Sequence, residues 1–329
     1  MWPHDAVAEL KRIAKEKPAA AGAVEEMREL PIDEMTRVTV VGSGQMGSQI
    51  GMLCALSGYD TVLVDIDPAA LRRTQRELAA RMNQWVAKKK LTATEKDAAM
   101  ARLSVSSSLE SAVGETDLVI ESVVEKLALK REIFAQLDHW APPHAILATN
   151  SSTIVSSQLA SNTARPDKVL NLHFFFPPLT VECVEVVVNA NTSEATAHAA
   201  LEFCHRIGRV GVLIRNEIPG FVANRILGAM EREAMALYEA GIADFHDIDL
   251  ICRQAFHHPM GPFEIMDLSG NDVTYLAMQQ MYEDTGDRDW KPCGSLVEKV
   301  KEGQLGRKTG IGWYTYPRED KNDQRSFKK

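Results

Sequence analysis

Two residues of the chain could together act as a general base. His173 ends a short apolar run, and Glu185 lies twelve residues further on, inside the valine-rich segment 181–188. A carboxylate within an apolar strand is costly unless it is paired. Pairing with His173 would satisfy Glu185, fix the imidazole tautomer and favour the protonated ring, as removal of a hydroxyl proton requires. The pair therefore predicts proton transfer at the end of a strand.

A glycine-rich loop earlier in the chain predicts binding of a dinucleotide. Residues 38–41 are β-prone and run directly into Gly42-x-Gly44-x-x-Gly47, which is followed by a helical pattern. Gly42 permits the tight turn, Gly44 lets the backbone approach a pyrophosphate, and Gly47 allows close packing of helix on strand. The helix N-terminus then offers N–H groups and a positive dipole end to the pyrophosphate.

An acidic residue after the next strand predicts which dinucleotide is bound. Asp65 ends the apolar run 61–64 and lies 18 residues after Gly47. A carboxylate at this place accepts hydrogen bonds from the adenosine ribose hydroxyls and repels a 2′-phosphate. The sequence therefore favours NAD over NADP as the cofactor.

The elements that must position these residues alternate along the first two thirds of the chain. Strand-like runs at 38–41, 61–64, 118–120, 146–149, 169–174, 183–188 and 210–214 are separated by helical patterns. This alternation predicts an α/β fold, a Rossmann-type doubly wound parallel sheet over residues 37–215. Helical patterns at 219–240, 248–256 and 273–282 predict an all-helical C-terminal domain over residues 216–329.

Residues 1–36 form a predicted helical extension, whose role could be a docking arm, a subunit contact or none. This segment is too acidic for a mitochondrial transit peptide and too polar for a signal peptide. The net charge of −8 argues against binding of nucleic acid or a membrane surface, and no apolar run approaches the roughly 18 residues that span a bilayer. Five scattered cysteines without a C-x-x-C pair suit a reducing compartment, so we expect a cytoplasmic protein without a metal site.

Residues 71–102 differ from the acidic average of the chain. They contain nine basic and three acidic residues. One interpretation is a long solvated helix with a charged face. The other is a platform for the phosphates of a second ligand, such as coenzyme A, because the glycine loop already serves the dinucleotide.

Several motifs in order resemble the 3-hydroxyacyl-CoA dehydrogenase family over roughly residues 37–316. They are 42–47 (GSGQMG), 150–152 (NSS), 173–175 (HFF), 184–186 (VEV), 219–225 (PGFVANR), 259–267 (PMGPFEIMD) and 305–314 (LGRKTGIGWY). The resemblance implies an NAD-binding domain, a helical dimerisation domain and a homodimer. It also implies oxidation of an L-3-hydroxyacyl-CoA to the 3-ketoacyl-CoA, a reaction of fatty acid β-oxidation.

The resemblance also implies roles for individual residues. His173 corresponds to the catalytic base and Glu185 to its partner, Ser152 to a serine that hydrogen-bonds the reacting oxygen, and Asn224 to an asparagine that completes the site. Without the resemblance, Ser152 could be a helix cap and Asn224 an ordinary polar residue in a first helical turn. Neutral donors beside the hydroxyl could stabilise charge that develops on oxygen.

Cofactor and coenzyme A contacts are implied in the same way. The cofactor contacts are Gly42, Gly44, Gln45, Met46, Gly47, Asp65, Glu125, Lys130, Ser152 and Lys308. Taken alone, Glu125, Lys130 and Lys308 would be interpreted as surface charges. Arg81 and Lys88 correspond to the positions that contact coenzyme A.

Two departures from the family pattern leave the substrate open. Phe176 replaces the usual asparagine after HFF, and Arg81 replaces a serine. A free 3-hydroxy acid of the carnitine or hydroxy-carboxylate type is therefore an alternative substrate. A non-catalytic NADH-binding protein is an alternative of another class, although the complete set His173, Glu185 and Asn224 argues against it.

Overall fold

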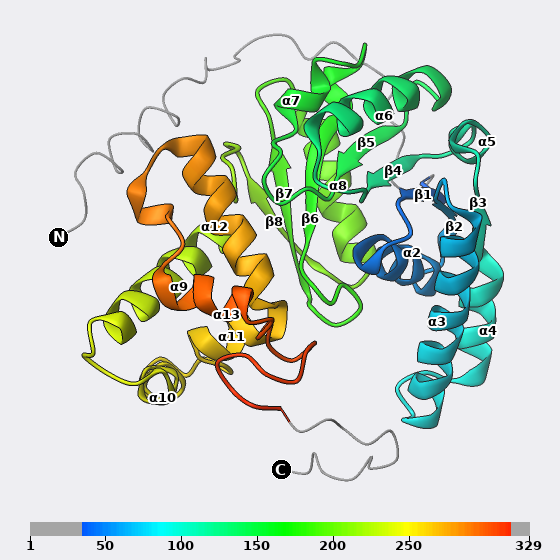
Figure 1. Cartoon of the computed structure of the whole chain (residues 1–329). Helices are drawn as coiled ribbons and strands as arrows, with labels where there is room; N and C mark the ends of the chain where they lie inside the picture. Colours follow the sequence, from blue (N-terminus) through cyan, green and yellow to red (C-terminus); the bar gives the residue numbers. More distant parts are fainter. Residues whose placement is uncertain (1–34, 317–329) are drawn as a thin grey trace. The chain divides into compact units, whose positions relative to one another are not determined.

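The computed structural model describes residues 35–316, apart from the side chains of residues 284 and 285 (Figure 1). The predicted extension at residues 1–36 lies almost wholly outside this range. The chain divides into two compact units, Met1–Phe221 and Val222–Lys329. Among the described residues, no helix is both long enough and apolar enough to cross a membrane.

The first unit is built on one eight-stranded sheet. The strands are β1 (Arg37–Val41), β2 (Asp60–Val64), β3 (Leu103–Ser106), β4 (Leu118–Glu121), β5 (Ile146–Thr149), β6 (Val169–Phe174), β7 (Cys183–Val188) and β8 (Val210–Ile214). Their order is β3-β2-β1-β4-β5-β6-β7-β8, and β1 to β6 are parallel. The first six strands thus have the Rossmann order, and the predicted doubly wound α/β fold is confirmed.

The sheet departs from the predicted parallel arrangement at one place near its edge. Strand β7 runs antiparallel to β6, and β8 runs parallel to β7. Only eight residues, 175–182, connect β6 to β7. A parallel return needs a crossover of about a dozen residues, so this short connection forces the chain to turn back. Strand β3 was missed, because the short sequence LSVS carries two serines at the sheet edge.

Helices cover both faces of the sheet. One face packs against α2 (Gln45–Leu56), α3 (Pro68–Ala87), α4 (Ala93–Arg102) and α8 (Glu194–Arg206). The other packs against α5 (Leu109–Val113), α6 (Leu127–Trp140) and α7 (Ser157–Ala160), and a 3-10 turn (Pro166–Lys168) precedes β6. Leu118 and Ile120 of β4 belong to the hydrophobic core on the first face, and Val119 belongs to the core on the other face. This is the two-residue alternation that a strand requires.

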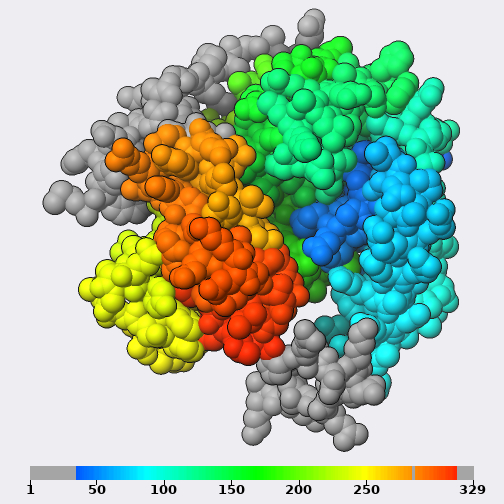
Figure 2. Space-filling model, in the orientation of Figure 1, coloured from blue at the N-terminus to red at the C-terminus, as the bar shows by residue number. Residues whose placement is uncertain are grey.

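The basic segment 71–102 forms two helices rather than the single long helix of one of the two interpretations. Helix α3 ends at Ala87, and Lys89 takes a left-handed conformation with φ 56°. Thr92 then begins α4 with a capping box, because its hydroxyl accepts from the Glu95 N–H and the Glu95 carboxylate accepts from the Thr92 N–H. In the space-filling view α3 lies on the surface of the first unit (Figure 2).

The second unit is helical, as predicted. Its helices are α9 (Ala223–Glu239), α10 (Phe245–Ala255), α11 (Pro262–Ser269), α12 (Asn271–Thr285) and α13 (Gly294–Lys301), with a 3-10 turn at Arg288–Trp290. Phe263, Met266, Trp290 and Trp313 are among the residues of its core. Helix α9 begins four residues after the predicted start at Pro219, because Gly220 and Phe221 both have positive φ and cannot continue a helical turn.

Residues 216–221 belong to the first unit, although we predicted the helical domain to begin at residue 216. The Glu217 carboxylate accepts from the Ser156 hydroxyl and the Ser157 N–H. The Gly220 N–H donates to the Ser152 carbonyl, and the Phe221 ring is fully buried. These contacts hold the connection on the sheet unit up to Phe221.

Candidate active site

His173, Glu185 and Ser152 meet at the end of the sheet. The Nδ1 atom of His173 lies 2.7 Å from Oε2 of Glu185, and its Nε2 atom lies 3.1 Å from Oγ of Ser152. Beside a carboxylate, Nδ1 carries the ring proton, so the lone pair of the neutral ring is on Nε2. The nitrogen that can accept a proton therefore faces the serine hydroxyl, and a substrate hydroxyl placed beside both atoms would contact both groups.

The antiparallel edge of the sheet creates the pairing of His173 with Glu185. The two residues are direct partners in the register of β6 and β7. Side chains of directly opposed residues lie on the same face of a sheet within contact distance. Both side chains are only 4% exposed, and the rings of Phe175 and Phe221 lie 4.7 and 5.4 Å from the imidazole centroid. The predicted partner of the buried carboxylate is therefore in place, and water has little access to the pair.

The loop after β5 holds Ser152 in position. The Asn150 side-chain oxygen accepts from the Phe174 N–H at 2.9 Å, which ties the loop to β6. The Ser151 hydroxyl and both the N–H and the hydroxyl of Thr153 bond to Glu125. The alternative reading of Ser152 as a helix cap does not fit, because the next helix, α7, begins five residues later at Ser157.

The three glycines of the loop after β1 each meet the geometric requirement predicted for them. Gly42 has φ +105°, and a Cβ there would lie 2.5 Å from the Ser122 carbonyl oxygen. A Cβ on Gly47 would lie 1.9 Å from the Gly42 oxygen, so helix α2 packs too closely for a side chain. A Cβ on Gly44 would meet no atom within 4 Å, which leaves open space at the N-terminus of α2, where Gln45 and Met46 follow. This cradle fits a pyrophosphate.

Asp65 directly follows β2 and stabilises the glycine loop. Its Oδ2 accepts from the Ser43 N–H at 2.9 Å and the Ser43 hydroxyl at 2.6 Å, and its Oδ1 accepts from the Asp67 N–H at 3.0 Å. Partial burial opposes ionisation, but these hydrogen bonds hold the pKa of Asp65 below its usual value. The carboxylate is therefore charged near neutral pH. It lies where it could bind ribose hydroxyls and repel a 2′-phosphate.

Lys130 is buried, so its interpretation as a surface charge was wrong. Its ammonium is 1% exposed and bonds to both oxygens of Glu121, at 2.7 and 2.9 Å, with Glu125 at 3.3 Å. Partial burial would raise the pKa of Glu125, but Lys130 and the hydrogen bonds from Ser151 and Thr153 hold it below its usual value. Enclosed in this way, Lys130 holds Glu125 beside the loop of Ser151, and its predicted contact with the cofactor stays a prediction.

Glu121 is a residue of this region that we did not predict. It ends β4, is fully buried, and accepts from the Thr149 hydroxyl at 2.7 Å and the Val123 N–H at 2.6 Å as well as from Lys130. The argument that identified Glu185 applies here too, because Glu121 is a carboxylate at the end of an apolar strand. That signal could have identified Glu121 as a paired residue.

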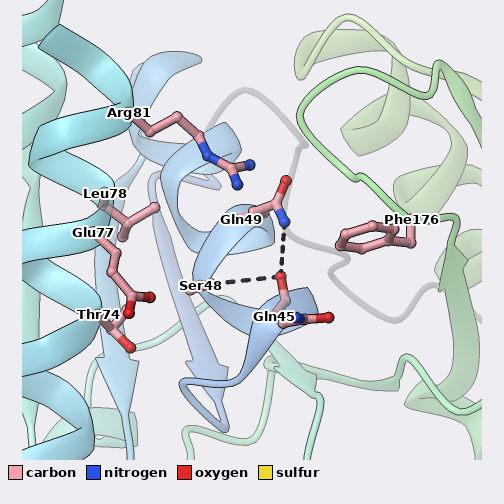
Figure 3. Close-up of a pocket in the computed structure, with 8 residues that line it drawn as sticks. All are labelled: Gln45, Ser48, Gln49, Thr74, Glu77, Leu78, Arg81 and Phe176. Atoms are coloured by element: carbon pink, nitrogen blue, oxygen red, sulfur yellow. Dashed lines mark hydrogen bonds between the residues drawn. The ribbon is translucent and has the colours of Figure 1, made fainter. Parts of the chain in front are cut away.

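The remaining predicted residues lie on two helices and a loop. Arg81 and Lys88 are exposed on α3 and at its C-terminus, respectively. Arg81 lines a hollow of about 260 Å³ together with residues of α2 (Figure 3). In the second unit, Asn224 is half-buried in the first turn of α9, and Lys308 pairs with Asp272. Within residues 35–316, no three His, Cys, Asp or Glu side chains group as a metal site would require.

Two family models together match almost all of the described residues. The model of the NAD-binding domain of 3-hydroxyacyl-CoA dehydrogenase matches residues 37–218, and the model of the C-terminal domain of the same enzyme matches residues 220–316. The chain belongs to the 3-hydroxyacyl-CoA dehydrogenase family. Its first unit is the NAD-binding domain of that family, in agreement with the glycine loop and Asp65.

Individual members of the family are similar over most of their length. A probable 3-hydroxybutyryl-CoA dehydrogenase of Bacillus subtilis is 36% identical over 86% of this chain and 98% of its own. The mitochondrial hydroxyacyl-coenzyme A dehydrogenase of Rattus norvegicus is also 36% identical, over 85% of this chain and 90% of its own. The crystal structure of (S)-3-hydroxybutyryl-CoA dehydrogenase from Ralstonia eutropha superimposes with a TM-score of 0.79 at 35% identity, covering 86% of this chain and 99% of that one.

Proposed function

We propose that this protein oxidises the C3 hydroxyl of a 3-hydroxyacyl-CoA to a ketone, with NAD as the hydride acceptor. The observation that supports this most is the line of Glu185, His173 and Ser152, with Nε2 facing the serine hydroxyl. These residues belong to the first unit, which matches the NAD-binding domain of the 3-hydroxyacyl-CoA dehydrogenase family. A base, a neutral donor and a nicotinamide site are the groups that oxidation of a secondary alcohol requires.

The described residues account for the movement of the proton. Bound NAD supplies the acceptor for the hydride that leaves C3. His173 takes the hydroxyl proton on Nε2, and Glu185 stabilises the imidazolium that results. Ser152 donates a hydrogen bond to the substrate oxygen and keeps it close to Nε2. Phe175 and Phe221 restrict water around the ring, which strengthens the interaction between the charges of His173 and Glu185.

Other residues enter the proposal through the family resemblance. Asn224 would donate its amide to the substrate oxygen, and Lys308 would contact the cofactor. Lys88 would bind coenzyme A phosphates from the end of α3. Alanine substitution at each position tests these roles. Replacement of Asn224 should lower kcat, replacement of Lys308 should raise the KM for NAD, and replacement of Lys88 should raise the KM for the thioester.

We also propose a cytoplasmic homodimer. The thiols of all five cysteines are free, as in a reducing compartment. Large apolar side chains are exposed on the helices of the second unit; they include Ile226, Leu250, Ile251, Val273 and Leu276. Such exposure suits a surface that a second copy covers. Sedimentation of the full chain as a monomer at micromolar concentration would contradict the dimer.

The central experiment compares substrates in wild type and in His173→Ala. The wild type should reduce NAD with 3-hydroxybutyryl-CoA or a longer homologue, and His173→Ala should lower kcat by about 100-fold or more. NADH absorbance gives the rate, and NADH binding to the variant shows that the cofactor site is intact. Turnover of free 3-hydroxy acids alone would favour the free-acid alternative. NADH binding without turnover of any 3-hydroxy compound would favour a non-catalytic protein.

A further inference from the structure

Asn171, in the middle of β6, directs its amide into the loop that carries Ser152. The side chain is fully buried. Its Oδ1 accepts from the Ser156 N–H at 2.8 Å, and its Nδ2 donates to the carbonyls of Ser151 and Ile154 at 3.3 and 3.1 Å. An asparagine side chain can make four hydrogen bonds. Most of this capacity is therefore used on the backbone of one loop.

The packing of β6 alone does not account for an asparagine at this position. Its strand neighbours, Leu170 and Leu172, are fully buried apolar residues. Asparagine is depleted in strands, and a buried amide is costly unless it is hydrogen-bonded. The bonds to the loop are therefore what distinguishes Asn171 from an apolar residue at the same place.

One of these bonds acts directly on the backbone of Ser152. The Ser151 carbonyl belongs to the planar peptide unit that joins Ser151 to Ser152. A hydrogen bond from Asn171 to this oxygen fixes the orientation of that peptide plane. The direction in which the Ser152 side chain leaves the backbone is therefore restrained by Asn171.

The same strand carries the base that Ser152 faces. Asn171 and His173 are two residues apart on β6, so their side chains lie on one face of the sheet, roughly 7 Å apart along the strand. The start of the loop is also attached to β6, through the bond from the Phe174 N–H to Asn150. The 3.1 Å distance between Ser152 Oγ and His173 Nε2 is thus set by attachments to a single strand.

A neutral side chain suits this place beside the base. A second charge on the face of His173 would shift the pKa of the imidazole, which Glu185 already stabilises in its protonated form. The amide of Asn171 holds the loop without adding a charge. It can therefore fix the position of the serine while the proton affinity of the ring stays as Glu185 sets it.

We infer that Asn171 is a positioning residue, which holds the Ser152 hydroxyl where it and His173 Nε2 can contact the same substrate oxygen. The inference rests on the proposed function, in which Ser152 donates to that oxygen. Asn171 is fully buried, so it acts through Ser152 and not on the substrate itself. Its effect on kcat should therefore disappear when the serine hydroxyl is absent.

A double-mutant cycle between Asn171 and Ser152 is the test. Asn171→Leu removes the three bonds and nearly keeps the side-chain volume. It should lower kcat for 3-hydroxybutyryl-CoA about 10- to 100-fold, because displacement of a reacting group by about 1 Å can cost that much. The apparent pKa in the pH profile of kcat/KM should stay unchanged, since Glu185 still faces His173. In a Ser152→Ala background, the same substitution should change kcat less than about twofold, and effects that multiply would overturn the inference.

Asn189→Leu is the matched control. Asn189 is also buried, and its amide donates to the Ser156 hydroxyl and the Val169 carbonyl, with no hydrogen bond to residues 150–154 in the described part of the chain. Both leucine variants should lower Tm, because each leaves buried groups unpaired. Only Asn171→Leu should lower kcat, and an equal loss in the control would overturn the inference.

Asn171→Ser is a second variant in case the leucine prevents folding. The smaller side chain leaves room for a water molecule at the carbonyls of the loop, so these remain paired while Ser152 loses its direct support. It should show the same dependence on Ser152 in the cycle. A folded Asn171 variant with wild-type kcat would contradict the positioning role.

A spectroscopic measurement separates this inference from the proposed function. If the wild type turned over no 3-hydroxy thioester, the proposed function would fail, but the ¹⁵N resonance of His173 Nε2 would still report its hydrogen bond with Ser152. The resonance is identified by its absence in His173→Ala. In Asn171→Leu it should move toward its position in Ser152→Ala, and in Asn189→Leu it should stay. An unmoved resonance in Asn171→Leu would overturn the inference.

Discussion

Replacement of Glu185 by glutamine should reduce kcat strongly while NAD still binds. The exchange keeps the size of the side chain but removes the charge that faces His173 Nδ1 at 2.7 Å. Both side chains are almost completely buried, so the imidazolium formed by proton transfer would have no counterion there. Loss of one partner of a buried ion pair costs about 3–5 kcal/mol. If the reaction bears this cost fully, kcat falls about 100- to 5,000-fold.

The assay is oxidation of 3-hydroxybutyryl-CoA, followed by NADH absorbance at saturating NAD. The KM for NAD should change little, since the glycine loop and Asp65 do not contact Glu185. Glu182→Gln is the matched control, because it makes the same exchange at an exposed position three residues earlier in the chain. A Glu185→Gln variant that kept more than about a tenth of the wild-type kcat would refute the assignment of His173 and Glu185 as base and partner.

Four further substitutions test other parts of the structure. Asp65→Ala should weaken the preference for NAD over NADP in kcat/KM. It should also raise the KM for NAD, because Ser43 loses its hydrogen-bond acceptor. Equal kcat/KM of the native protein with NAD and NADP would contradict the role of Asp65 in cofactor choice. Gly47→Ala should abolish NADH binding measured by fluorescence, since its Cβ would lie 1.9 Å from the Gly42 oxygen. Lys88→Ala should raise the KM for the coenzyme A thioester several-fold but not that for the pantetheine thioester, and the effect should shrink at high salt. Burial raises the pKa of Glu231 to about 8 from 4.5, so the folded state retains a proton that the unfolded state releases, and stability is lost as pH rises through this window. Glu231→Gln should therefore raise Tm by about 5 °C or more at pH near 8 and much less near pH 5, and equal shifts at both would disprove the argument.

The local parts of the site could be predicted from the sequence. The positive φ of Gly42 and the contact of Gly47 with the Gly42 oxygen arise within a few residues of the chain, so spacing identifies them, whereas the close approach of Gly42 to Ser122 depends on the fold. The pairing of His173 with Glu185 could also be predicted, because a carboxylate among valines needs a partner and His173 is the basic side chain that precedes it in the chain. Both arguments depend on short-range constraints that a single sequence contains.

Features that depend on tertiary packing were harder to predict. In the sequence, Lys130 cannot be distinguished from a lysine on the surface of a helix. Its burial depends on the fold, which places Glu121 at the end of β4 in contact with it. The bonds of Asn171 could not be predicted at all, since they depend on which backbone atoms of the loop after β5 approach β6. The break between α3 and α4 could be predicted from Thr92 and Glu95, which have the spacing of a capping box, although the basic charge pattern continues across it.

At the antiparallel edge of the sheet, the contact between His173 and Glu185 depends on backbone pairing as much as on side-chain chemistry. His173 faces Glu185 because β6 and β7 share one register, with Val184 and Val186 as the neighbours of Glu185 along the strand. A slip by a single residue would bring a valine opposite the imidazole and turn Glu185 to the other face of the sheet. Insertion or deletion of one residue within β6 or β7 would therefore separate His173 from Glu185. The proposed proton transfer therefore depends on the pairing of β6 with β7.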